Sequence, residues 1–291
     1  MHRRYEKMKR TRRRKGMFVA LGAVLAVVGI LMIWFNIAYS PLKKRFEKDT
    51  RRLAKQYAMG FDGEVFTEKD FEGLPEAIRR YAENCGYIGK KKMSYLKMQY
   101  KDVDFCTGKN GAKMKMDYTQ YNYAKEPCRM AFDDAGMFGV PFQGYDYFED
   151  GKGGMKGVLA KLITLFNERG EEMDRACLVT YLAESLFVPT ALTSGYISFE
   201  QISEREVRGS ITYKGQTVSG VFTFNDNYEM TSFVTTDRKD DKTPWTALCS
   251  DYKVSSDGIK LPTVFKAVWN FSDGDFVYFD GRIDAVSYGF E

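Results

Sequence analysis

The feature that most constrains this chain is an uncharged run near the N-terminus, from Met17 to Tyr39, in which Asn36 is the only strongly polar side chain. As a helix that rises about 1.5 Å per residue, the run reaches roughly 34 Å, enough to cross a hydrocarbon core of about 30 Å. Trp34 and Phe35 lie near its distal end, where amphipathic rings favour the headgroup layer. The sequence therefore predicts a membrane-spanning helix over residues 17–39.

A cleaved signal peptide is the main alternative, because Ala38-Tyr39-Ser40 places small residues at the two positions that a signal peptidase reads. The run is longer than the roughly 7 to 15 apolar residues of such a peptide, and Pro41 would follow the cut. We therefore favour an uncleaved anchor. Residues 3–15 contain nine Lys and Arg with one acidic residue, and residues 43–55 contain seven with two acidic residues. This bias predicts a single-pass protein of the cell membrane, with a cytoplasmic N-terminus and an extracytoplasmic C-terminal domain.

The positive charge of the chain is confined to the two flanks of this run. Residues 1–16 carry +8 and residues 40–55 carry +5, so the remainder carries −8 within a chain total of +5. Basic flanks can meet the anionic headgroups of the bilayer, which is the expected partner. A nucleic-acid partner is not expected, because the rest of the chain is acidic and has no zinc-finger spacing or basic recognition helix.

These observations divide the chain into four parts. We expect a basic cytoplasmic tail over 1–16, the transmembrane helix over 17–39, a charged, helix-compatible juxtamembrane stalk over 40–60, and one domain over 61–291. A hydrophobic content of 44% can supply a core for a domain of that size.

Periodicity places the main elements of the domain. "LPEAIRRYAENCGY" reads as a short amphipathic helix that ends at Gly86, and "MDRACLVTYLAESLFVPTAL" reads as a second helix that begins at Asp174 and stops at Pro189. "KMSYLKMQYK" and "KMKMDYTQY" alternate as strands do, and "GKGGMKG" reads as a flexible turn. From Ile197 onward, short strands alternate with Asn and Asp-Gly turns, which predicts an antiparallel meander.

The predicted fold class is α+β: the transmembrane helix is followed by a mainly antiparallel, curved, half-barrel-like sheet. Two short helices can cover only part of so large a sheet, so we expect a partly covered apolar concavity. The aromatic content of 15% fits either a filled sheet core or an apolar ligand surface.

Some kinds of chemistry are disfavoured by residue content. The only histidine is His2, which leaves the domain without the usual base of Ser-His-Asp and Cys-His catalysis and without the commonest zinc ligand. We expect no metal and no cofactor. The five cysteines include no CxxC pair, and a Cys106–Cys128 disulfide is one open possibility.

Several strings together resemble a known family. "LPEAIRRYAENCGY", "YLAESLFVPTAL", the Asp-Arg pair ending at Arg238, "TPWTALCSDYKVSSDGIKLPTVFKAVW" and "DFVYFDGRIDAVSYGF" occur in this order. The set is similar to a bacterial and archaeal family of membrane-associated proteins catalogued as a domain of unknown function. The resemblance implies that the recurrent positions are Gly154, Tyr181, Glu184, Pro189, Arg238, Trp245, Tyr252, Gly258, Pro262 and Trp269. Phe187 stands where the family has a Trp, and no reaction is implied.

Two sets of side chains are candidates for function. Glu184 and Asp150 are the candidate catalytic carboxylates, because a buried carboxyl with a raised pKa can act as an acid or base. A solvated or ion-paired Glu184, with Arg238 as its partner, is the competing interpretation. The candidate ligand-binding residues, which can equally be packing residues, are Trp245, Trp269, Phe187, Tyr181, Arg238 and Tyr252.

Three functions remain open from the sequence. The first is a non-enzymatic binding module for a lipid, another apolar ligand or an envelope partner protein. The second is a carboxylate-dependent hydrolase or transferase that acts on the cell envelope and uses Glu184. The third is a purely structural envelope protein.

Overall fold

A computed structural model describes residues 2–61, 63–137 and 139–290 of the chain, and it divides into two compact units, residues 1–40 and 41–291. The first unit contains the helix α1 (His2–Asn36), which includes the apolar run up to Asn36. This helix is long and apolar enough to span a membrane, and the side chains of its apolar window are not buried in the protein.

The second unit is built on one open antiparallel sheet of 13 strands, in the order β6-β5-β4-β3-β2-β1-β13-β12-β11-β10-β9-β8-β7. Two meanders, β1–β6 and β7–β13, are joined where β1 pairs with β13. The predicted C-terminal meander and α+β class are confirmed. The strands are β1 (Tyr95–Cys106), β2 (Lys113–Tyr123), β3 (Cys128–Met137), β4 (Val140–Glu149), β5 (Lys152–Leu159), β6 (Ile163–Glu168), β7 (Ile197–Ser203), β8 (Glu206–Tyr213), β9 (Gln216–Phe224), β10 (Met230–Thr235), β11 (Trp245–Val254), β12 (Lys260–Phe271) and β13 (Gly274–Gly289).

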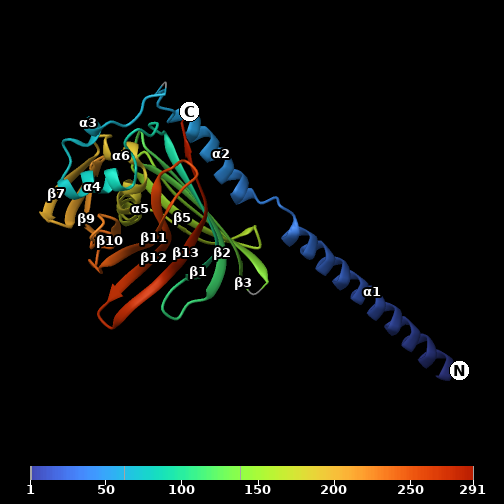
Figure 1. The fold of residues 1–291 in the computed structure, drawn as a ribbon. Coiled ribbons are helices and arrows are strands. Elements are labelled where there is room, and N and C mark those ends of the chain that lie inside the picture. The colour runs from blue at the N-terminus through green and yellow to red at the C-terminus, as the bar shows by residue number, and fades with distance from the viewer. Residues whose placement is uncertain (1, 62, 138, 291) are drawn as a thin grey trace. The chain divides into compact units, whose positions relative to one another are not determined.

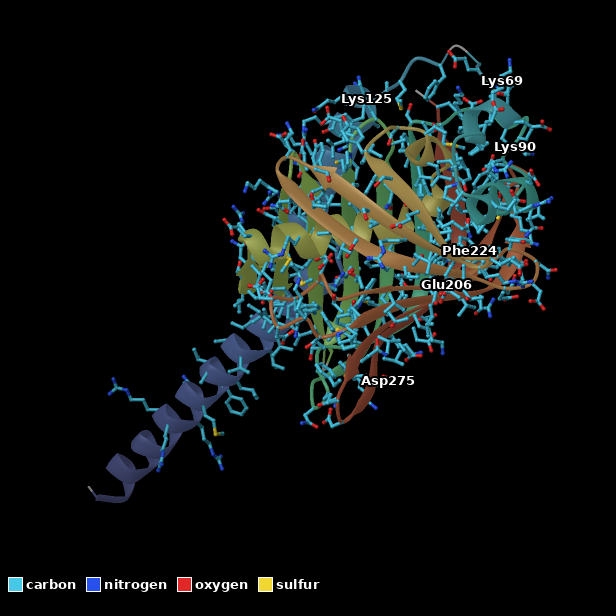
Figure 2. The ribbon with its side chains drawn as sticks, turned by 90° about the vertical axis from the view of Figure 1, so that its left-hand side faces the viewer. Lys69, Lys90, Lys125, Glu206, Phe224 and Asp275 are labelled. Carbon is cyan, nitrogen blue, oxygen red and sulfur yellow. The ribbon has the colours of Figure 1, made fainter. Side chains whose placement is uncertain are left out.

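The sheet curls around the helix α5 (Glu171–Glu184), which packs on β3, β4 and β5 from one meander and on β8 and β9 from the other. Figure 2 shows α5 between the green strands of the first meander and the orange strands of the second. We call the face of the sheet that carries α5 the concave face. One core fills it, formed with α3 (Glu68–Phe71), α4 (Glu76–Asn84), the 3₁₀ turn η1 (Ser185–Phe187) and α6 (Pro189–Leu192). The expected apolar concavity is therefore occupied by the protein's own side chains.

The opposite, convex face of β3 and β4 carries the helix α2 (Pro41–Gln56), as Figure 1 shows. Leu42, Phe46 and Leu53 lie on one side of α2 and are buried, and the ring of Phe46 stacks on Phe132 with centroids 5.5 Å apart. The segment predicted as a stalk is thus helical, but it is packed on the sheet as part of the folded unit.

The helix predictions are confirmed in position and differ in their ends. α4 ends at Asn84, and Gly86 follows the C-cap as predicted: its positive φ allows a Schellman motif in which the Tyr87 N–H donates to the Ala82 carbonyl. α5 begins one turn before Asp174 and ends at Glu184, so Pro189 begins α6 instead of stopping α5. The Asp174 carboxylate accepts a hydrogen bond from the Gly153 N–H at 2.7 Å, which ties α5 to β5 and is not a cap.

Two further expectations are corrected. The glycine-rich segment predicted as a flexible turn is strand β5. Its Gly153 allows α5 to approach the strand closely, because a Cβ at this position would lie 2.8 Å from the Cys177 Sγ atom. The five cysteines are free, so Cys106 and Cys128 are not bridged.

Removal of the Phe46 ring tests whether α2 belongs to the fold. We expect Phe46→Ala to lower the free energy of unfolding of the full chain by about 3 kcal/mol, as for other buried rings. Urea unfolding followed by near-ultraviolet circular dichroism measures the change. The control Lys48→Ala, at an exposed position of the same helix, should stay within about 0.5 kcal/mol of the parent. Equal stabilities of the two variants would contradict the packing of α2.

Candidate functional site

A polar network lies on the concave face beneath the C-terminal end of α5. The Arg129 guanidinium, on β3, donates to both carboxylate oxygens of Glu184, at 2.8 Å and 3.0 Å. Asn122, on β2, donates to the same carboxylate at 2.7 Å, and Arg129 also donates to the Tyr118 hydroxyl at 2.5 Å. The side chains of Arg129 and Glu184 are only 9% and 17% exposed. Glu184 is therefore an ion-paired tie between helix and sheet, as the competing interpretation expected, but its partner is Arg129 and not Arg238.

Two more carboxylates point into the concave face beside this pair. One carboxylate oxygen of Asp133 and one of Asp146 are sealed from solvent and accept no hydrogen bond from the described residues. Burial raises the pKa of Asp146 to about 6, although Arg129 and Arg238 oppose the shift. Burial and the charge of Asp146 raise the pKa of Asp133 well above its usual value. The protonated forms of these groups are favoured because a charge in this interior lacks water and hydrogen-bond donors.

The loop after β10 brings Arg238 over the two tryptophans that the sequence singled out. Its guanidinium carbon lies 4.6 Å from the ring centre of Trp245 and 5.9 Å from that of Trp269. The same guanidinium donates to the Thr180 hydroxyl on α5, so the helix fixes its direction. Trp245 and Trp269 face each other across β11 and β12, and Trp245 is 4% exposed, whereas Trp269 is half-buried.

Further rings and cations extend this group toward solvent. The Trp269 ring stacks with Phe271 and with Tyr278, at centroid distances of 6.3 Å and 6.4 Å. The Lys239 amine lies 4.5 Å from the centre of the Trp269 ring. These six residues form what we call the aromatic–cation cluster: Arg238, Lys239, Trp245, Trp269, Phe271 and Tyr278. It lies toward the turn between β12 and β13, which Figure 2 marks with Asp275.

The six residues of the cluster include two cations and no carboxylate. Among the described residues, neither Arg238 nor Lys239 forms an ion pair with a carboxylate. Lys109, which lies 4.8 Å from the Phe271 ring, is instead paired with Asp273. Carboxylates lie near both cations beyond ion-pair distance: the charge of Arg238 opposes the rise in the pKa of Asp146, and the pKa of Asp241 is lowered by hydrogen bonds from Thr243 and by the charge of Lys239. Cations that lie on rings without a direct ion pair keep part of their charge available to an external anion.

The other candidate residues lie apart from the cluster and serve the core. Tyr181 is buried and donates to the Tyr123 carbonyl at 2.8 Å, and Phe187 is buried edge-on against Phe265. The Tyr252 hydroxyl donates to the Met230 carbonyl at 3.0 Å. Asp150 lies in the exposed turn between β4 and β5 and pairs with Lys214, and none of its described interactions reaches Glu184.

Sequence reasoning missed Arg129, Asp133, Lys239 and the two rings that flank Trp269. Arg129 and Asp133 lie on a strand buried on both faces, where polar and apolar residues do not alternate. A usable signal for the rings was present in the pattern Trp269-x-Phe271 beside Phe276-x-Tyr278, two aromatic pairs of period two that flank one turn.

Two further features of the described residues concern metal binding and surface hollows. No group of three His, Cys, Asp or Glu side chains among them is placed to hold a metal ion. Two surface hollows lie outside the concave face, one beside α4 and one between α2 and β1–β3, and both are lined mainly by polar side chains.

Loss of the Glu184 charge should expose its structural role. Glu184→Gln removes the charge of the carboxylate that is hydrogen-bonded to the buried Arg129, so we expect a loss of about 3 kcal/mol in the free energy of unfolding. Glu76→Gln is the matched control, because Glu76 pairs with Arg80 on the surface of α4 and should change stability by less than about 0.5 kcal/mol. Urea titration measures both. A Glu184→Gln variant as stable as the control would contradict the tie.

The raised pKa of Asp146 makes stability depend on pH with a defined sign. The folded state keeps the Asp146 proton up to about pH 6, whereas the unfolded chain loses it near pH 4, so the free energy of unfolding falls as pH rises across this window. Asp146→Asn has no carboxyl to ionise, so its free energy of unfolding should not fall across this window. We expect the variant to be about 2 to 3 kcal/mol more stable than the parent at pH 7.5 and equally stable at pH 4. Asp150→Asn, at the exposed turn, should match the parent at both values. If the free energy of unfolding varied with pH in the same way for Asp146→Asn and the parent, the raised pKa of Asp146 would be contradicted.

Comparison with known proteins agrees with the resemblance noted from the motifs. No curated protein matches the chain. A family model described as "Family of unknown function (DUF6544)" matches residues 64–281, which covers β1 to β12, α5 and every member of the aromatic–cation cluster. The chain therefore belongs to this family of unknown function, DUF6544.

Proposed function

We propose that the outer unit is a non-enzymatic binding module that α1 anchors in a membrane, and that its ligand is an anionic amphiphile held at the aromatic–cation cluster. The observation that carries this proposal is the pair of cations, Arg238 and Lys239, which lie on the rings of Trp245 and Trp269 and form no ion pair with a carboxylate of the described residues. An acidic headgroup supplies the missing counter-charge. The rings of Trp269, Phe271 and Tyr278 supply an apolar surface for the attached chain.

The geometry of the cluster suits recognition of such a headgroup. Arg238 is fixed by its hydrogen bond to Thr180 and by the Trp245 ring beneath it, so little side-chain entropy remains to be lost on binding. The Trp245 ring is fixed in turn, because its indole N–H donates to the Tyr278 hydroxyl at 3.0 Å. The receptor side is thus preorganised before the ligand arrives.

The arrangement of carboxylates favours binding over the alternative of an envelope hydrolase or transferase. Glu184 accepts three hydrogen bonds from Arg129 and Asn122, so its oxygens are already engaged. Asp150, the other catalytic candidate, lies at an exposed turn in an ion pair. Neither is poised to move a proton to or from a substrate. The charge bias around the apolar run, with more Lys and Arg before it than after it, supports placement of the module outside the cytoplasm.

Binding of a short-chain anionic lipid tests the proposal. The full chain in phosphatidylcholine nanodiscs is titrated with dihexanoyl phosphatidic acid while tryptophan fluorescence is recorded, with empty nanodiscs as the blank. We expect saturable binding that Trp269→Ala and Arg238→Gln each weaken at least about tenfold, roughly 1.4 kcal/mol. Arg205→Gln is the matched control, because Arg205 also lies against a ring, that of Tyr228, but is paired with Asp226. Equal affinities of the parent, both cluster variants and the control would contradict the proposed site.

A further inference from the structure

Large apolar side chains are exposed where β5 turns into β6. Leu162, Ile163 and Leu165 are 67%, 58% and 49% exposed, and they lie within four consecutive residues. β6 is an edge strand of the open sheet, and no Lys or Pro occurs within Ile163–Glu168 to protect it. An exposed apolar edge strand normally marks a surface that another apolar phase or molecule covers. We call these three side chains the apolar tip.

Contacts of α2 show at which end of the sheet the apolar tip lies. Near the C-terminal end of α2, Arg52 pairs with Glu149 at the end of β4, and one turn earlier Asp49 accepts a hydrogen bond from Tyr145. The N-terminal end of α2 therefore lies toward the Val140 end of β4. That end of β4 pairs with the end of β5, where Phe142 is opposite Leu159, and the turn to β6 follows directly. The apolar tip and the N-terminus of α2 thus lie at the same end of the sheet.

The chain connection sets which end of the unit stays near the anchor. Only residues 37–40 separate the end of α1 at Asn36 from the start of α2 at Pro41. Five residues of extended chain, which advance at most about 3.6 Å each, keep Asn36 and Pro41 within roughly 18 Å of each other. The end of the sheet that carries the apolar tip is therefore the end that the chain tethers to the apolar helix.

We propose that the apolar tip enters the interfacial layer of the bilayer that α1 spans, as a second membrane attachment of the protein. The first turn of α2 at the same end carries Lys43, Lys44 and Arg45, and basic side chains favour anionic headgroups beside an inserted apolar segment. Ile163 and Leu165 are two positions apart on β6, and Leu162 precedes them in the turn, so lipid, which needs no complementary shape, can cover all three side chains. This attachment uses other residues than the aromatic–cation cluster and does not depend on that ligand.

A fluorescent label at the apolar tip tests the contact in the full chain. Ile163→Cys carries the environment-sensitive dye NBD, and the chain is placed in nanodiscs with or without lipids that bear a nitroxide at carbon 5 of an acyl chain. Ile202→Cys is the matched control, because Ile202 is 46% exposed on β7, the opposite edge of the sheet. The parent chain, labelled in parallel, gives the background from its five native cysteines.

The proposal expects the label at position 163 to emit at shorter wavelength and to lose at least half of its intensity to the nitroxide lipid, while the label at position 202 does neither. Leu162→Asp and Leu165→Asp, added together to the Ile163→Cys chain, should abolish the quenching with the fold retained by circular dichroism. Absence of quenching at position 163, or equal quenching at both positions, would overturn the proposal. A shift to shorter wavelength without quenching, with a dimer mass by native mass spectrometry, would overturn it in favour of edge pairing between two copies.

Discussion

The packing of α5 against both meanders is the contact on which the rest of the folded unit depends. Strands β3 to β5 and strands β8 and β9 are far apart in the sheet, and they meet the same helix only because the sheet curls. Small residues allow this approach. A Cβ at Gly153 would lie 2.8 Å from the Cys177 Sγ atom, and one at Gly209 would lie 2.6 Å from the Phe222 ring that packs beneath the helix. With α5 in place, Thr180 orients Arg238, and the aromatic–cation cluster takes its shape.

Beneath the same helix lies a group of buried polar side chains inside an otherwise apolar core: Arg129, Glu184, Asp133 and Asp146. The pairing of Arg129 with Glu184 offsets the cost of burying both charges, since Glu184 accepts three hydrogen bonds and Arg129 also donates to Tyr118 and Gln120. Asp133 and Asp146 have no such compensation, and their raised pKa values express the cost of burying their charged forms.

Much of this architecture could be predicted from the sequence, for identifiable reasons. β1 and β2 alternate because Lys97 and Gln99 point away from the core while Leu96 and Met98 point into it. β3 does not alternate, because α2 covers one of its faces and α5 the other, so Met130 and Ala131 are both buried. The stripe of Leu42, Phe46 and Leu53 could have shown that α2 packs on a surface, but the surrounding charges suggested a solvated stalk. Trp245, Trp269 and Arg238 were predicted as candidates; that they meet is a property of the loop after β10, whose path no periodicity encodes.

Native mass spectrometry of the full chain, extracted from its own membrane and followed by lipid analysis, tests the central claim most directly. Binding at the aromatic–cation cluster predicts a defined additional mass that belongs to an acidic amphiphile and that is lost from an Arg238→Gln, Trp269→Ala double variant. A parent chain that carries no ligand, or one whose bound lipid is retained by the double variant, would contradict the account.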